Sequence, residues 1–136
     1  MDQSTLVSVQ LDDGKRLMDR LVAEGKTVSA AAWVKERDGG YWYLYLATSL
    51  MGKDRGVRPA YRFVNAIVRS LQPEGFWIDP TSIKVIAPDD PLASAIAEVR
   101  NRYPAQKPFW YPAQKPFWLR GDRLGPLEIE EAIIYP

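Results

Sequence analysis

The chain has 136 residues, of which 46% are hydrophobic and 26% are charged, and its formal net charge is +1. This length suits a single domain, and the composition is typical of soluble globular proteins rather than of disordered chains. The balanced charge excludes a whole-molecule field that would attract nucleic acid or an anionic membrane, although it is compatible with a local basic patch.

The sequence contains neither cysteine nor histidine. The lack of cysteine excludes disulfides, thiolate nucleophiles and cysteine metal sites, and the lack of histidine excludes serine–histidine catalysis and the commonest metal ligand. We therefore expect no metal site and no cofactor, and an enzyme of this sequence would have to use carboxylates, lysine or tyrosine. The polar N-terminus and the absence of any apolar run near about 20 residues predict a cytoplasmic protein without a signal peptide or membrane span.

The first predicted helix runs from Asp12 to Gly25, because apolar residues recur at three- and four-residue spacing between positions 17 and 22. Asp12 and Asp13 are interpreted as N-terminal caps that accept hydrogen bonds from free backbone N–H groups. A metal-binding role for this pair is the less favoured alternative, because carboxylates at helix starts are common.

Two β-rich runs on either side of residues 38–40, Asp-Gly-Gly, predict a hairpin within about residues 28–50. A two-residue turn would set Val34 beside Tyr43, whereas a three-residue loop pairs Val34 with Leu44 and gathers the aliphatic side chains on one face. We predict the second register, in which small alanines leave room for a helix on the aliphatic face. The opposite face would then carry an aromatic and basic set: Trp33, Lys35, Tyr43 and Tyr45.

The remaining pattern predicts a helix over residues 59–72, a strand over 82–87, a helix opening at Pro91, and a final strand from Leu127 with a bulge at Glu131. The element order is α-β-β-α-β-α-β. We therefore predict an α+β fold, a single domain over residues 1–136, with a mainly antiparallel sheet and its helices packed on one face.

The outer face of the hairpin is the first candidate binding surface. It comprises Trp33, Lys35, Tyr41, Tyr43 and Tyr45. Aromatic side chains on a sheet can stack on nucleobases, and tyrosine and tryptophan are also frequent anchors of protein interfaces. Burial of this face under another element of the same chain is the structural alternative.

A basic run is the second candidate, formed by Lys53, Arg55, Arg58 and Arg62. Arg58 and Arg62 are four residues apart and should project together from the predicted helix, where they could hold phosphate. The run lacks the spacing of a phosphate-binding P-loop, and an ordinary solvated surface is the alternative.

The segment 103–118 is an exact tandem duplication of the eight residues YPAQKPFW. Its four prolines block continuous helix and central strand, so we expect an extended connection rather than a repeat architecture. Each copy ends in an aromatic pair, Phe109-Trp110 and Phe117-Trp118. One copy could dock while the other loops out, the longer connection could allow a domain-swapped homodimer, or the segment could be a proline-rich ligand.

These patterns favour a non-enzymatic module that binds a protein partner or another copy of itself. The first alternative is a nucleic-acid-binding module that uses the basic run of residues 53–62 together with the hairpin aromatics. The second alternative is an enzyme that depends on carboxylates or lysine, although no catalytic motif is recognisable.

Overall fold

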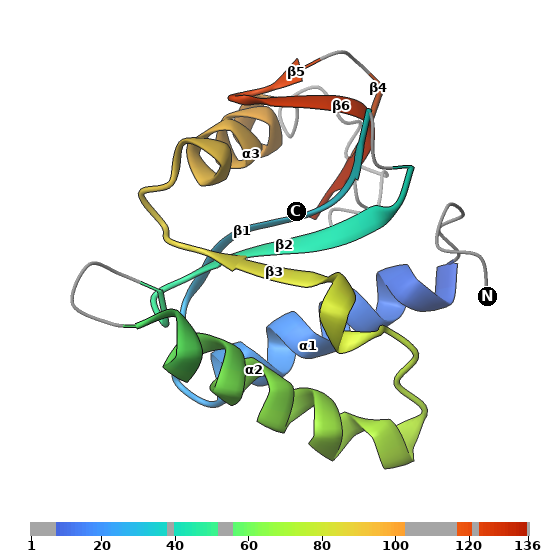
Figure 1. The fold of residues 1–136 in the computed structure, drawn as a ribbon, viewed down its shortest axis with the longest axis vertical. Helices are drawn as coiled ribbons and strands as arrows, with labels where there is room; N and C mark the ends of the chain where they lie inside the picture. Colours follow the sequence, from blue (N-terminus) through green and yellow to red (C-terminus); the bar gives the residue numbers. More distant parts are fainter. Residues whose placement is uncertain (1–7, 38–39, 52–55, 103–116, 121–122, 136) are drawn as a thin grey trace, which may run out of the picture.

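The computed structural model describes residues 8–37, 40–51, 56–102, 117–120 and 123–135, and its elements are drawn in Figure 1. In chain order, the elements are α1 (Ser8–Ala23), β1 (Val28–Glu36), β2 (Trp42–Thr48), α2 (Val57–Leu71), the 3-10 helices η1 (Gln72–Glu74) and η2 (Pro80–Ser82), β3 (Ile83–Ile86), α3 (Pro91–Arg102), β4 (Phe117–Arg120), β5 (Arg123–Leu124) and β6 (Leu127–Ile134). The α+β class and the predicted order of helices and strands are confirmed.

The strands form one sheet in the order β3-β2-β1-β6-β4, with β5 paired to β6 beside this path. Every pair is antiparallel except β2 with β3, which is parallel. The sheet is therefore mixed, because α2 carries the chain across before it returns as β3. The last strand, β6, lies between β1 and β4, so the first and last described strands are neighbours in the sheet.

Helices cover both faces of this sheet, whereas the sequence analysis expects them on one face only. In Figure 1, α1 and α2 lie on one side of the sheet and α3 lies on the other. Two separate clusters of buried side chains result, one with α1 and α2 and one with α3. The reason lies in β1, whose residues from Ala30 to Val34 are all buried, because such a continuous apolar run suits a strand covered on both faces.

The register of the hairpin differs from the prediction. Val34 pairs with Tyr43 and Trp33 pairs with Leu44, which is the pairing that the sequence analysis rejects. The predicted register placed the aliphatic side chains on one face because the other face was expected to be exposed. Both faces are buried, so aliphatic side chains can lie on either of them. Ala30 and Ala32 do leave room for a helix, since both lie in the cluster with α3.

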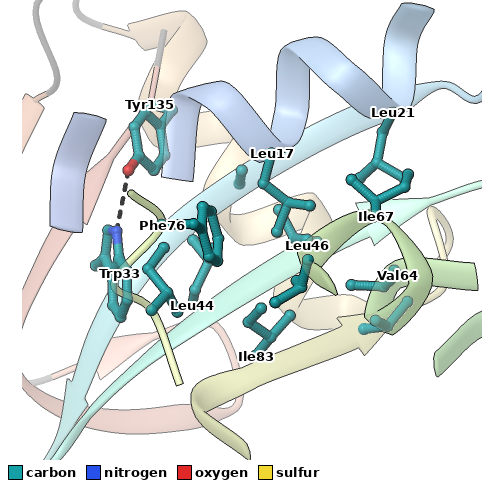
Figure 2. Close-up of a cluster of buried hydrophobic side chains, with 14 of the residues drawn as sticks. Leu17, Leu21, Trp33, Leu44, Leu46, Val64, Ile67, Phe76, Ile83 and Tyr135 are labelled. Atoms are coloured by element: carbon teal, nitrogen blue, oxygen red, sulfur yellow. Dashed lines mark hydrogen bonds between the residues drawn. The ribbon is translucent and has the colours of Figure 1, made fainter. Parts of the chain in front are cut away.

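The first helix begins at Ser8, so Asp12 and Asp13 lie within it and are not its N-terminal caps. Its buried side is marked by Leu17 and Leu21, which are fully buried with residues of the sheet and of α2 in the core that Figure 2 shows. The aspartates appeared to be caps because the weakly apolar first turn gives little sign of a helix.

The C-terminal strand carries the predicted irregularity. Lys35 pairs with Glu131 and Glu36 pairs with Ile129, which leaves Glu130 as the extra residue of a bulge next to the predicted position. On the other side of β6, the second copy of the duplicated block begins β4, where Phe117 and Trp118 pair through their backbones with Ile134 and Ile133. Phe109 and Trp110 lie outside the described residues.

Candidate anion-binding face

The hairpin aromatics do not form one surface. Trp33 is fully buried against α1 and α2, while Tyr43 and Tyr45 lie with the opposite cluster around α3. The indole N–H of Trp33 donates to the hydroxyl of Tyr135 at 3.0 Å, and that hydroxyl donates to the carbonyl of Leu11 at 2.7 Å; Figure 2 shows the first of these bonds. Burial raises the pKa of Tyr135, so the hydroxyl stays protonated as a donor.

Tyr43 and Tyr45 belong to a closed polar network. The Tyr45 hydroxyl donates to the carboxylate of Glu36 at 2.7 Å, and the ammonium of Lys84 lies 3.4 Å from that hydroxyl and 3.6 Å from the same carboxylate. The ammonium also lies 4.3 Å from the centre of the Tyr43 ring, within cation–π range. Burial, and then Glu36, raise the pKa of Tyr45, which suits a structural donor and not a general base.

The last two hairpin candidates lie near solvent. The side chain of Lys35 forms an ion pair with Glu130 at 3.6 Å, whereas Tyr41 is 47% exposed. Tyr41 is thus the most accessible of the hairpin aromatics. The predicted aromatic and basic surface on the hairpin therefore does not form. Its members lie in two separate cores, in an ion pair and, for Tyr41, at the protein surface.

Helix α2 brings together the described part of the basic run. Its buried side is formed by Ala60, Val64, Ile67, Val68 and Leu71. Arg58, Arg62 and Arg69 are exposed, and at 100° per residue they fall within an arc of about 40° on the opposite side. The helix contains no acidic residue. Lys53 and Arg55 lie outside the described residues.

Most other described surface cations have a carboxylate partner. The pairs are Lys15–Asp19, Arg16–Asp13, Arg16–Glu74, Arg20–Glu24, Lys35–Glu130, Arg37–Glu128 and Lys84–Glu36. Within the described ranges, no such ion pair includes an arginine of α2. We call Arg58, Arg62 and Arg69 the arginine row; its charge is not neutralised by described carboxylates.

A cleft of about 400 Å³ lies beside the arginine row, between α2 and the outer edge of the sheet. It is lined by Tyr61, Asn65, Pro80, Thr81, Ile83 and Lys84. The hydroxyl of Tyr61 accepts a hydrogen bond from the backbone N–H of Val85 at 3.0 Å, so the tyrosine also covers the free edge of β3. None of these six lining residues is a carboxylate.

A smaller hollow of about 250 Å³ lies on the other flank of α2. It is lined by Arg20, Glu24, Phe63, Ala66, Ile67 and Ser70. Lys26 lies nearby, with its ammonium 5.2 Å from the centre of the Phe63 ring. The carboxylate of Glu24 lies 3.7 Å from the guanidinium of Arg20, so the negative charge that Glu24 brings to this flank of α2 is partly neutralised.

The sequence predicted that Arg58 and Arg62 share one face, and the structure places them so. Asn65 and Lys84, which line the neighbouring cleft, were missed. Asn65 could have been found from its helical spacing, but Lys84 reaches the cleft only through the parallel pairing of β3 with β2, for which the sequence gives no local signal.

The described residues contain no group of three or more acidic side chains arranged to hold a metal ion. In the same part of the chain, no helix is both long enough and apolar enough to cross a membrane. Comparison of the chain with protein-family models, with curated proteins and with solved structures found no match.

Proposed function

We propose that this protein is a non-enzymatic interaction module whose partner docks on the exposed face of α2. The observation that carries the proposal is the arginine row: three arginines on one helix face without a described carboxylate partner, in a molecule that pairs most of its other described cations. Charges that have no partner among the described carboxylates and that lie on one face of a helix can steer and orient an oppositely charged partner.

The α2 face replaces the hairpin as the proposed docking surface. Trp33 and Tyr45 are buried, so their rings are committed to the two cores and contribute little to an interface. The network of Glu36, Tyr45 and Lys84 brings together the groups that an enzyme of this composition would need, but its members already satisfy one another. Both features support binding rather than catalysis.

Self-association is a second proposal and rests on a different observation. The strand β4 lies at one end of the sheet order, and its first two residues are the last two of the duplicated segment. The longer connection would give the C-terminal strand the reach to pair with a second copy of the chain, which would form a swapped homodimer. The cytoplasmic location stays a prediction from the sequence.

Chromatography on immobilised heparin tests the α2 face without assuming which anionic partner it binds. We expect the triple variant Arg58→Gln, Arg62→Gln, Arg69→Gln to elute at much lower salt than the natural protein, because the exposed row would be lost. The matched control is Lys15→Gln, Arg37→Gln, Arg123→Gln, which removes the same charge from other elements and should elute close to the natural protein. Equal losses in both variants would mean that net charge governs retention, and the proposal would fail.

A further inference from the structure

We infer that the arginine row binds the phosphate backbone of a nucleic acid strand. This inference rests on the proposed function, since it names the partner of the α2 face. It is carried by the arrangement of the three arginines, by the amide of Asn65 beside them, and by the scarcity of apolar groups on the same face.

The arginines form a line rather than a cluster. At a rise of 1.5 Å per residue, Arg58 and Arg62 are separated by about 6 Å along the helix, and Arg69 lies about 10 Å further on. A small anion could contact one or two of these guanidinium groups but not the whole row. A polymer with regularly repeated negative charge matches all three.

The chemistry of the face suits phosphate. Each guanidinium presents a planar fork of donors that can bind two phosphate oxygens at once. Asn65 lies between Arg62 and Arg69 on the same side of the helix and lines the cleft, so a side-chain amide adjoins the row. Phosphate contacts in protein–nucleic acid complexes use these kinds of groups.

An acid next to the cleft residues in the sequence already has hydrogen-bond partners. Asp79 precedes the cleft residues Pro80 and Thr81, and its carboxylate accepts from the backbone N–H of Thr81 at 2.9 Å and from the Thr81 hydroxyl at 2.8 Å. These two bonds lower the pKa of Asp79, the backbone bond more than the hydroxyl bond. Its charge is therefore held by the start of η2 and is partly satisfied there.

The same face is a poor match for an acidic protein. Protein interfaces usually contain a buried apolar or aromatic anchor surrounded by polar groups. On α2 the large apolar side chain that is strongly exposed is Val57, in the first turn, and the residues of the helix that flank the arginine row on its own side are Asn65 and Ala66. A polar and positive surface of this kind is characteristic of nucleic-acid contacts.

Fluorescence anisotropy with a labelled single-stranded oligothymidylate of about 15 nucleotides tests the inference. Three phosphate contacts predict that the logarithm of the affinity falls with the logarithm of the salt concentration with a slope of about −2. The variant Arg58→Gln, Arg62→Gln, Arg69→Gln should bind at least about tenfold more weakly and show a slope near zero. The control Lys15→Gln, Arg37→Gln, Arg123→Gln should keep the slope of the natural protein.

A polyglutamate peptide of similar length and charge distinguishes the proposed function, that a partner docks on the α2 face, from the inference that this partner is a nucleic acid. If it binds as tightly as the oligonucleotide and both depend on the arginine row, the face recognises acidic protein; the interaction module stands and the nucleic-acid inference fails. If neither polymer binds in a way that depends on the row, both proposals fail. Far-UV circular dichroism and thermal melting of each variant establish that the fold is retained.

Discussion

Asp13 connects the first helix to a loop that follows α2. Its side chain is almost fully buried, and its carboxylate accepts from the backbone N–H of Trp77 at 2.7 Å and from Arg16 at 3.1 Å. The bond from the Trp77 N–H to Asp13 holds a loop in which Phe76 and Ile78 are buried, whereas Trp77 itself is 68% exposed. The aspartate predicted to begin a helix instead holds together two segments that are 64 residues apart.

Replacement of Asp13 by alanine should lower the free energy of unfolding by about 2–4 kcal/mol, because the partly buried N–H of Trp77 would lose its acceptor and Arg16 would lose one of its two carboxylate partners. Asp13→Asn should cost less, since an amide oxygen can still accept from Trp77. Urea denaturation measures both. The matched control is Asp19→Ala, which breaks the exposed pair with Lys15 and should cost less than about 1 kcal/mol. An equal cost at the two positions would contradict the role given to Asp13.

Gly14, the next residue, allows Tyr135 to approach the backbone of α1. A Cβ atom at position 14 would meet the Tyr135 hydroxyl and would lie 3.0 Å from the ring carbon that carries it. The same hydroxyl accepts from Trp33 and donates to Leu11, so it has little freedom to move. Glycine costs a helix about 1 kcal/mol relative to alanine, and here the close approach explains its presence.

We expect Gly14→Ala to destabilise the protein although alanine is the better helix former. Tyr135→Phe should also destabilise it, by about 1–3 kcal/mol, because the Trp33 N–H would be buried without an acceptor. In the double variant the two costs should not add, since loss of the hydroxyl also relieves the clash at position 14. A double-mutant cycle measured by urea denaturation gives this coupling, and purely additive costs would show that the two residues do not interact.

At the scale of elements, helices were easier to predict than the sheet. Residues 57–71 and 91–102 are helical close to their predicted bounds, because apolar spacing, proline and glycine act within a few residues of sequence. The strands β1, β2, β3 and β6 were located equally well, whereas β4 and β5 were not predicted. The register and the two buried faces of the sheet depend on which helices cover it. That information lies elsewhere in the chain, so the preference for an aliphatic face misled the hairpin prediction.

The candidate site shows the same division. Four-residue spacing was sufficient to place Arg58 and Arg62 on one face of a helix. The cleft beside them was not predictable, because Thr81 and Lys84 reach it only after β3 has paired with β2. The sequence left open whether the hairpin aromatics form a binding surface or are buried, because a strand alone does not reveal whether its outer face will be covered by a helix.

The covered edge of β3 gives a test at this scale. In Tyr61→Phe, the backbone N–H of Val85 loses its hydrogen-bond acceptor and its shield at the edge of the sheet. We expect faster amide hydrogen exchange at Val85 with little change at Leu46, in the neighbouring strand. Nuclear magnetic resonance resolves both amides. Uniformly faster exchange would indicate global destabilisation instead of local exposure of the edge.

For the whole molecule, the duplicated block raises the question of which copy the fold uses. Deletion of either copy gives the same shortened sequence, so deletion tests only whether both copies are needed. We expect that protein to fold, because Phe-Trp would still precede Leu119 and β4 could pair with β6 as before. Failure to fold would show that the copies are not redundant. Light scattering of both forms tests the swapped dimer, which should be present only with the longer connection.

Substitutions distinguish the copies where deletion cannot. Trp118 belongs to β4, whose backbone pairs with β6. We expect Trp118→Ala to lower the free energy of unfolding more than Trp110→Ala, because Trp118 stands in a strand of the sheet. Thermal unfolding of the two variants measures the difference. Equal costs would mean that the fold does not prefer the second copy.

The central position of β6 has a consequence for how the protein is made. Its partners on both sides, β1 and β4, are synthesised before it, and the bond between Trp33 and Tyr135 joins residues 102 positions apart. Until β6 has been synthesised, the edge of β1 that pairs with it has no partner strand, and the indole N–H of Trp33 lacks the Tyr135 hydroxyl as its acceptor. Because residues 129–135 contribute to both cores, a chain that ends before β6 should aggregate or be degraded.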